Sequence, residues 1–144
     1  MASPPSPKPQ STMHKTTLAI LAAYEHQSID EIMSFRTPDC IQTILPSSLS
    51  RPEMSNTAYR TFFAATIPKI WNFRIKISEI IESPRSNKVV VLASSTADSK
   101  AGTGTYGQEY VLVFEFDESG ENITKMVEWV DSVKAKEQAA LLFG

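Results

Sequence analysis

Apolar residues recur at helical spacing in the first part of the chain and at alternating positions in the second part. The helical spacing predicts a helix over Thr12 to His26, whose apolar stripe includes Leu18 and Leu21. A second short helix is expected after Ser28, because Ser28 and Glu31 stand at the spacing of a capping box. Two helices are therefore expected between Thr12 and Pro38.

The second helix should end before Pro38, since proline disfavours helical geometry in the residue before it. A short strand is expected over Cys40 to Leu45, and the polar stretch Ser47 to Ser55 is expected to form a loop. Asn56 is a suitable N-cap for a third helix over Thr57 to Ile67.

Alternation of apolar and polar residues marks the second part as sheet-forming. The expected strands are Trp71 to Ile77, Lys88 to Thr96, Glu109 to Phe116 and Asn122 to Asp131. A hairpin turn at Asp117 to Gly120 joins the last two strands, and a helix over Ser132 to Phe143 closes the chain. Because helices precede a run of antiparallel strands, the expected fold class is α+β.

Length and composition fit one globular domain. The chain has 144 residues, of which 42% are hydrophobic and 21% are charged. Four of its nine prolines fall within Ala2 to Ser11. Residues 1–11 are therefore expected to be a mobile Pro-rich tail, followed by a single domain over residues 12–144.

Charge and cysteine content narrow the possible surroundings and partners. The formal net charge is -2 without a basic stripe, which argues against a nucleic-acid partner. Apolar runs such as Val89 to Ala93 are much shorter than a membrane span. The lone Cys40 allows no intrachain disulfide, and the first residues carry no apolar signal-peptide core. A cytoplasmic protein without a membrane partner is expected.

Several short motifs are better explained without a cofactor or a metal. Gly102 to Gly107 matches G-x-G-x-x-G, but a strand follows it where a dinucleotide site needs a helix. With only His14, His26 and Cys40, the chain has too few ligands for a zinc site and too few bases for a serine-type triad. Cys40 is interpreted as a buried structural thiol.

Charged residues among the apolar strands and at the helix ends are the candidates for chemistry. Glu109 precedes Tyr110 in an apolar strand, Glu128 and Asp131 lie in the last strand, and Arg36 follows the second helix. Taken singly, each is most simply a solvated or capping residue, and Asp131 would serve as N-cap of the last helix. Together they would supply acids, bases and an anion holder to one aromatic cavity, which is the minimum for proton-transfer chemistry.

Several stretches of the chain resemble the SnoaL-like proteins of the NTF2-like superfamily, in particular the small fungal isomerases and cyclases of polyketide and meroterpenoid pathways. The matching stretches are Arg36 to Cys40, Leu45 to Leu49, Asn56 to Arg60, Gln108 to Tyr110 and Glu128 to Ser132. The resemblance covers about residues 14–140 and is greatest to the tetrahydroxanthone isomerases. It implies a cone made of a curved antiparallel sheet wrapped around helices, an apolar cavity for one small ligand, no cofactor, and a homodimer that pairs through the sheet.

The resemblance also implies a function and a set of site residues. The expected reaction is acid–base isomerisation of a hydroxylated, xanthone-type aromatic polyketide to a dearomatised tetrahydroxanthone. Asp131 is the preferred base and Glu109 the next, with Glu128 behind them, while Arg36 and Tyr59 would stabilise the oxyanion. The residues expected to bind the substrate are Phe63, Trp71, Tyr110, Glu128 and Trp129.

Other functions remain compatible with the sequence. One alternative is an isomerase or cyclase of a meroterpenoid lactone, and another is a non-catalytic module that binds a small ligand. Related terpenoid isomerases place a histidine among their catalytic groups, whereas the sheet-forming part of this chain contains none. A carboxylate would have to take that role here.

Overall fold

The computed structural model describes residues 10–99 and 105–143 of the chain. Nearly all of the expected Pro-rich tail and most of the glycine-containing loop lie outside these residues. The helices are α1 (Thr12–Glu25), α2 (Ile29–Ser34), α3 (Asn56–Thr66) and α4 (Ser132–Phe143), with short 3-10 turns η1 (Ser47–Leu49), η2 (Ile67–Lys69) and η3 (Pro84–Ser86). The strands are β1 (Arg36–Leu45), β2 (Ile70–Ser83), β3 (Lys88–Ser99), β4 (Thr105–Phe116) and β5 (Ile123–Val130).

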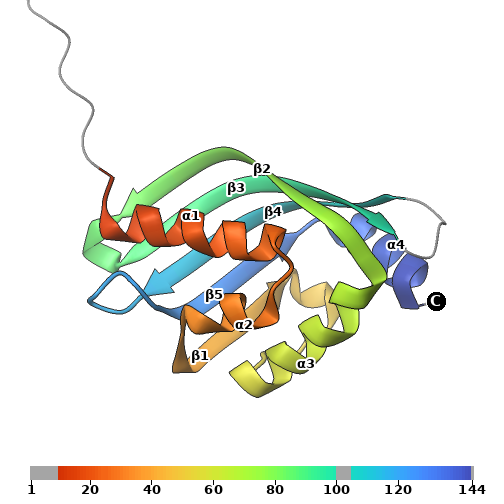
Figure 1. Ribbon diagram of the computed structural model, residues 1–144, viewed down its shortest axis with the longest axis horizontal. Helices are drawn as coiled ribbons and strands as arrows, with labels where there is room; N and C mark the ends of the chain where they lie inside the picture. Colours follow the sequence, from red (N-terminus) through yellow and green to blue (C-terminus); the bar gives the residue numbers. More distant parts are fainter. Residues whose placement is uncertain (1–9, 100–104, 144) are drawn as a thin grey trace, which may run out of the picture.

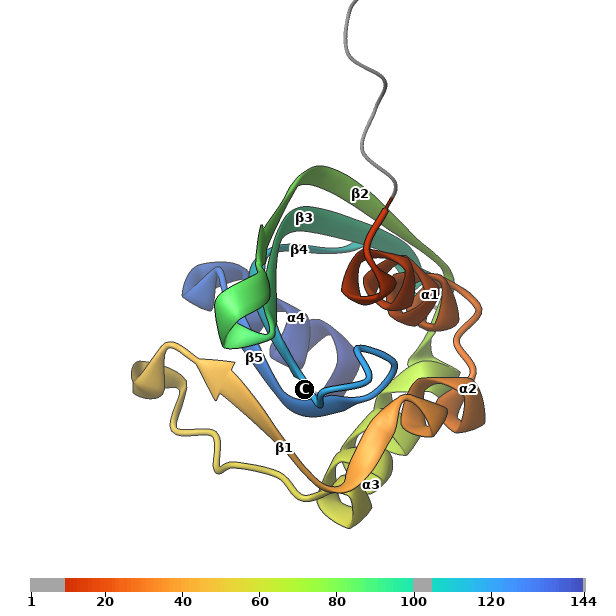
Figure 2. The same ribbon diagram turned by 90° about the vertical axis from the view of Figure 1, so that its left-hand side faces the viewer.

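The five strands form one curved sheet in the order β1-β5-β4-β3-β2, with β1 parallel to β5 and the other pairs antiparallel. In Figure 2 the sheet curves from β2 to β1, and α1, α2 and α3 lie along its open side. The expected α+β fold is confirmed, as is the expected wrapping of the sheet around helices (Figure 1). This arrangement leaves a concave face that helices cover and an outer face that they do not.

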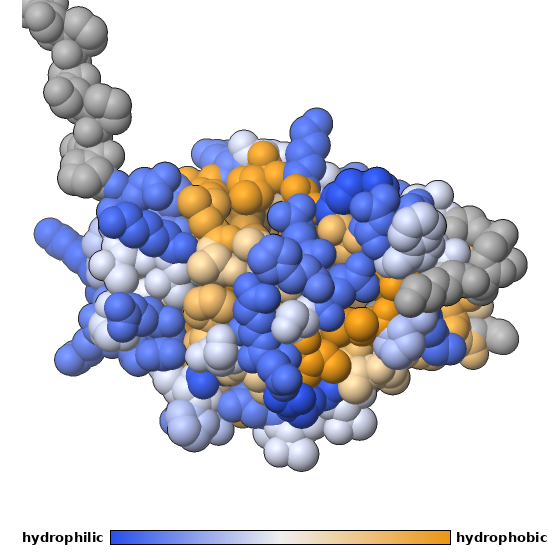
Figure 3. All heavy atoms as spheres, in the orientation of Figure 1, coloured by the Kyte–Doolittle hydropathy of each residue, from blue (hydrophilic) through white to orange (hydrophobic). Residues whose placement is uncertain are grey.

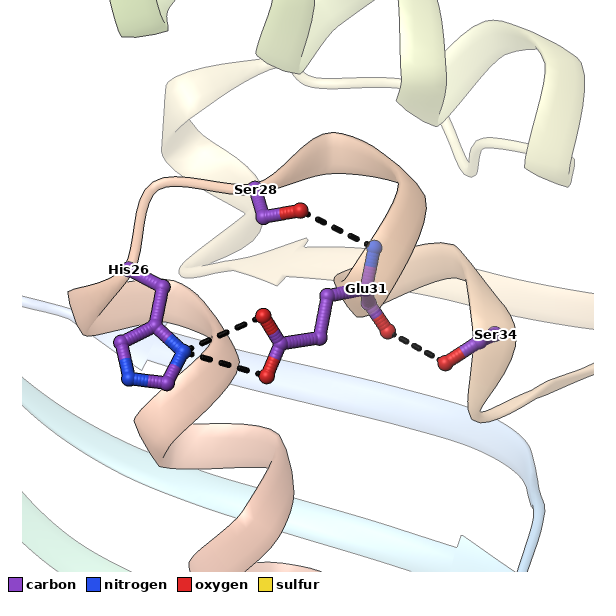
Figure 4. A network of polar contacts seen from close by, with 4 residues as sticks. All are labelled: His26, Ser28, Glu31 and Ser34. Carbon is purple, nitrogen blue, oxygen red and sulfur yellow. Dashed lines mark hydrogen bonds and ion pairs between the residues drawn. The ribbon is translucent and has the colours of Figure 1, made fainter.

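The capping box expected at the start of α2 is only half formed. The Ser28 hydroxyl accepts a hydrogen bond from the backbone N–H of Glu31 at 3.2 Å, as predicted. The Glu31 carboxylate, however, turns to His26, whose Nδ1 lies 3.1 Å from both of its oxygens (Figure 4). An acid in the first turn still suits the positive end of the helix dipole.

Asn56 does not cap α3, contrary to the prediction. Ser55 is the N-cap and accepts from the backbone N–H of Ala58, and Asn56 is the first helical residue. The amide of Asn56 instead donates to the backbone carbonyl oxygen of Thr37 at 2.8 Å. This hydrogen bond ties α3 to the first residues of β1.

Strand β1 begins at Arg36, four residues earlier than expected. The sequence suggests a helix stop at Pro38, but the pairing of Arg36 with Ile123 of β5 extends the strand through the proline. Strand β5 is distant in sequence, so this parallel pairing has no local signal. As a result, Arg36, Cys40 and Gln42 are buried side chains of one strand.

A bulge near the start of β2 changes which side chains face the core. Asn72 has a positive φ of 57°, and the pairing with β3 shifts register between Trp71 and Arg74. A bulge of this kind breaks the alternation of faces. Trp71 is therefore 52% exposed, while Phe73 packs against the core.

The core lies between α1 and the concave face of the sheet. Ile20 and Leu21 of α1 pack in one buried cluster with Val91 of β3 and Phe114 of β4. None of the helices within residues 10–99 and 105–143 is long and apolar enough to cross a membrane. The cavity described next borders this cluster, since Tyr24 and Ile44 belong to the cluster and also line the cavity.

Candidate functional site

A cavity lies between the concave face of the sheet, α3 and α4. Its volume is about 140 Å³. A single water takes up roughly 10–15 Å³ of such a cavity, so the cavity is large enough for a small organic molecule. Figure 3 shows apolar surface beside the region where α3 leads into β2 and α4 ends.

Most of the cavity wall is apolar or aromatic. The strands and α3 contribute Ile44, Phe62, Phe63, Phe73, Tyr106 and Val130, and α4 contributes Ala135, Ala139, Leu142 and Phe143. Lys69 holds the end of α4 in place, because its ammonium donates to the carbonyl oxygen of Leu142 at 2.9 Å. An apolar wall with few polar groups is typical of small-molecule sites.

Glu128 is the carboxylate inside this cavity. Within β5 it pairs with Leu112 of β4 and with Ile44 of β1, and both of these residues are buried on the concave face. Side chains that are paired across strands lie on the same face of a sheet. The Glu128 carboxylate therefore points inward, and it lines the cavity.

The surroundings of Glu128 favour its neutral form. Burial raises the pKa of this carboxyl from 4.5 to about 7, while the charges of Arg51 and Arg36 and a hydrogen bond from Gln42 oppose the rise. Burial dominates because removing a carboxylate from water is costly. A group that titrates near neutral pH can both accept and return a proton.

Arg51 is the cation of the cavity wall. It lies in the segment between η1 and α3, is half-buried, and places its guanidinium carbon 5.5 Å from the centre of the Phe62 ring. Its charge is the main influence that holds the pKa of Glu128 down. Arg51 therefore supplies positive charge where an oxyanion of a ligand could form.

Arg36 and Tyr59 lie together behind the cavity wall. The guanidinium carbon of Arg36 is 4.6 Å from the centre of the Tyr59 ring, and both residues are buried. The Tyr59 hydroxyl is 2.6 Å from that of Tyr24, which does line the cavity. Burial raises the pKa of both tyrosines, so both hydroxyls stay protonated at neutral pH. Arg36 and Tyr59 were expected to contact an oxyanion, but neither lines the cavity.

Gln108 and Gln138 are two further polar residues that line the cavity. Gln108 is buried, and both ends of its amide have partners: the oxygen accepts from the backbone N–H of Glu109 and of Asp131, and the nitrogen donates to the Asp131 carbonyl oxygen. Gln138 of α4 differs, because its buried Oε1 has no hydrogen-bond partner among the described residues.

Three of the predicted site residues lie on the outer face of the sheet. Glu109, Trp129 and Asp131 line a shallow depression there with Val111, and Trp129 is 48% exposed. Trp129 pairs with Val111 and so faces away from the cavity. The expectation that Trp129 walls the cavity is wrong, because the concave face of β5 carries Met126, Glu128 and Val130 instead.

Asp131 takes the second of the two roles considered for it. Its Oδ1 accepts from the backbone N–H groups of Val133 at 2.9 Å and Lys134 at 3.1 Å, which makes it the N-cap of α4. Glu109 is exposed on the outer face. Neither carboxylate reaches the cavity that Glu128 lines.

The remaining predicted residues divide between the cavity and its surroundings. Phe63 lies in the cavity wall, and its ring centre is 5.3 Å from that of Tyr24. Tyr110 lies beside the wall, where its hydroxyl is 2.8 Å from that of Ser95. Trp71 is placed outside by the bulge in β2.

Sequence reasoning missed Arg51, Gln42 and Gln138. Arg51 is a single cation in a polar loop, and Gln138 belongs to a helix with no distinct polar stripe, so neither position carries a signal. The position of Gln42 does carry a signal, because Gln42 shares a strand face with Cys40 and Ile44. A polar residue between two buried apolar residues indicates a buried hydrogen-bond partner for its side chain.

Metal-binding and thiol chemistry find no support in the described part of the chain. It contains no group of three or more His, Cys, Asp or Glu side chains placed to bind a metal ion. Cys40 is 1% exposed, and burial raises the pKa of its thiol. This is the buried structural thiol that the sequence predicted.

Comparison with known proteins relates the chain to fungal secondary-metabolite clusters. Core atranone cluster protein 11 of Stachybotrys chlorohalonatus is 30% identical over 122 residues, which cover 85% of this chain and 90% of that protein. The monooxygenase AacuP of Aspergillus aculeatus is 28% identical over 130 residues, which cover 90% of this chain and 88% of that protein. No family model matches the chain.

Solved structures with a similar fold come from a fungus and from a bacterium. The BvnE pinacolase of Penicillium brevicompactum has a TM-score of 0.84 and 26% identity, covering 90% of this chain and 89% of that one. A protein of Shewanella denitrificans described as a SnoaL-like polyketide cyclase has a TM-score of 0.74, with 11% identity over 92% and 99% of the two chains. The second likeness concerns the fold alone.

Proposed function

Since the chain belongs to the SnoaL-like family of the NTF2-like superfamily, among its fungal secondary-metabolite cluster proteins, we propose that it is an isomerase that moves a proton within an aromatic polyketide. The likeness to a pinacolase supports an isomerase-type enzyme. The proposal adds the reaction type, the acid–base group and the class of substrate.

The position of Glu128 is the observation that carries this proposal. It is the carboxylate that lines the apolar cavity, and its pKa of about 7 suits a group that must alternate between its two protonation states. A carboxylate in an apolar pocket is a recurrent way to obtain a base that works near neutral pH. Glu128 thus takes the role first expected for Asp131.

The proposed reaction needs no change in the composition of the substrate. The Glu128 carboxylate removes a proton from the carbon next to a ketone, so a C–H bond breaks and the electron pair forms an enolate. The carboxylic acid then returns the proton to a different atom of the conjugated system. The result is an isomer of the starting compound.

Arg51 and the aromatic wall would support this step. The Arg51 guanidinium stabilises the enolate or phenolate oxygen as its charge develops, and such stabilisation is often the largest contribution to catalysis. The flat rings of Phe62 and Phe63 suit the faces of a planar, fused-ring compound. We therefore propose a hydroxylated xanthone-type substrate that is already at the reduction level of a tetrahydroxanthone and carries a C–H next to its ketone. The dearomatised tetrahydroxanthone product is then an isomer of this substrate, and no reductant is needed.

The names of several relatives favour a second candidate, an oxygenation. AacuP and other homologous proteins are called monooxygenases. An oxygenation differs from an isomerisation in one measurable respect, since it adds an oxygen atom from O₂ to the product.

One labelling experiment separates the two candidates. The purified protein is incubated in D₂O under ¹⁸O₂ with hydroxylated xanthone-type ketones at the tetrahydroxanthone reduction level, and the product is analysed by mass spectrometry. An isomerase gives a product without ¹⁸O whose mass equals that of the substrate apart from any deuterium taken up during the proton transfer, and the Glu128→Gln variant fails to form it. Incorporation of ¹⁸O at a rate that depends on the protein would overturn the proposal.

A further inference from the structure

Gln42 connects the buried charge of Arg36 to Glu128. Its side chain is completely buried in β1. The amide oxygen accepts from Nη1 of Arg36 at 2.9 Å, and the amide nitrogen donates to Oε1 of Glu128 at 2.9 Å. The backbone of Gln42 is held as well, because its N–H and C=O both pair with Met54 at 2.9 Å.

The chemistry of Arg36 fixes the orientation of the Gln42 amide. A guanidinium only donates hydrogen bonds, so the amide must present its oxygen to Arg36 and its NH₂ group to Glu128. Arg36 is fixed in turn, because its Nε donates to Oδ1 of Asn56 at 2.8 Å. The Asn56 amide cannot reverse without losing its own hydrogen bond to the Thr37 carbonyl oxygen. Each group in this chain therefore has one workable orientation.

We propose that Gln42 is a positioning residue that keeps Oε1 of Glu128 as a permanent hydrogen-bond acceptor and so confines proton exchange to Oε2. The inference rests on the proposed role of Glu128. A proton on Oε1 would meet the N–H of Gln42, placing two donors face to face in a buried site. Oε2 accepts no hydrogen bond from the described residues. The proton taken from the substrate carbon is therefore held on Oε2 and leaves from it.

Loss of the Gln42 donor should change the titration of Glu128 in a defined direction. The hydrogen bond from Gln42 stabilises the ionised carboxylate, so its removal raises the pKa of Glu128 further. Gln42→Met removes both hydrogen bonds at similar volume. Gln42→Glu keeps an acceptor for Arg36 but loses the donor and adds a negative charge beside Glu128. In both variants the pH at the midpoint of the Glu128 titration should rise.

The test is an infrared titration of the Glu128 carboxyl stretch, identified by its absence in Glu128→Gln, together with the pH profile of kcat/KM. We expect both midpoints to rise by about one pH unit in Gln42→Met and Gln42→Glu, the size expected for a lost hydrogen bond to a charged group. The value of kcat should fall about tenfold or more with little change in KM, because an unpositioned base affects the chemical step.

The neighbouring residue supplies a matched control. Thr43 follows Gln42 on β1, and its hydroxyl is buried without a hydrogen-bond partner among the described residues. Thr43→Val should leave both midpoints where they are in the wild type. Melting curves identify any variant that does not fold, and Gln42→Glu is the closest in shape to the wild type.

The outcomes separate this inference from the function on which it rests. Unchanged midpoints in folded Gln42→Met or Gln42→Glu would overturn the positioning role. Full turnover by Glu128→Gln would overturn the proposed function, and the confinement of proton exchange with it. If Glu128→Gln keeps full turnover, a shifted infrared midpoint in the Gln42 variants would still show that the hydrogen bond to Glu128 exists. The failure would then lie in the proposed function and not in the hydrogen bond.

Discussion

Glu128 and Trp129 are neighbours in β5, but their side chains lie on opposite faces of the sheet. Glu128 points into the cavity beside Ile44 and Leu112, whereas Trp129 is 48% exposed on the outer face. The strand thus carries one residue for the chemistry of the cavity and one for the outer surface. A single step along the chain separates the two roles.

The first prediction concerns the catalytic carboxylate. Glu128→Gln should lower kcat/KM by about 10²–10⁴-fold, the usual contribution of a positioned acid–base group. Asp131→Asn and Glu109→Gln should keep nearly wild-type rates, because both side chains lie outside the cavity. Steady-state kinetics of the three variants decide the matter. A large loss of activity in Asp131→Asn alone would return the role of base to that residue.

The second prediction concerns stability and pH. Because folding raises the pKa of Glu128 from 4.5 to about 7, the folded state holds this proton more tightly than the unfolded state. The contribution of Glu128 to stability is therefore greatest below about pH 4.5 and falls as the pH rises to about 7. Glu128→Gln has no such penalty, so it should melt several degrees above the wild type at about pH 8. The difference in melting temperature between the variant and the wild type should shrink at about pH 5. Equal differences at both pH values would contradict the raised pKa of Glu128.

The local signals of the sequence predicted most of the elements. An apolar stripe placed α1 and the Ser28 cap placed α2, and alternation placed the strands that form β3, β4 and β5 within a few residues of their observed bounds. These features depend on neighbouring residues, so they can be recognised in the sequence alone. The fold class followed from the order of the elements.

The site could not be predicted in the same way, because it depends on which face of each strand is covered. In β5 both faces are apolar, with Met126 on the inside and Val127 and Trp129 on the outside, so alternation could not place Glu128 inward. Only the non-local pairing of β5 with β1 and β4 decides which face of the sheet carries the Glu128 side chain. The positive φ of Asn72 likewise turned Trp71 outward against the pattern of its strand.

The third prediction tests the capping role of Asp131. Asp131→Ala should destabilise the protein by about 1 kcal/mol, because two backbone N–H groups of α4 lose their acceptor. Asp131→Asn should cost much less, since asparagine caps helices about as well as aspartate. Chemical denaturation of the two variants measures the difference, and equal stability of both would contradict the capping role.

The fourth prediction concerns self-association. On the outer face Val111 pairs with Trp129 and Val113 pairs with Val127, which gives an apolar surface that no described helix covers. We expect a homodimer that pairs through this surface. Trp129→Arg should make the protein monomeric in light scattering, whereas Trp71→Arg, on the edge strand β2, should leave the dimer intact. A wild-type protein that stays monomeric at high concentration would exclude this arrangement.

The fifth prediction concerns how α4 selects a ligand. Oε1 of Gln138 is buried in the cavity wall without a partner among the described residues, so a ligand hydroxyl that donates to it would remove an unfavourable group. Gln138→Leu should raise KM about tenfold for a substrate with a hydroxyl at that position, the equivalent of one hydrogen bond. An analogue without the hydroxyl should show no such change. The free variant should be as stable as the wild type or more so, because the unpaired acceptor is gone. If KM rises equally for both compounds, Gln138 shapes the cavity but does not recognise the hydroxyl.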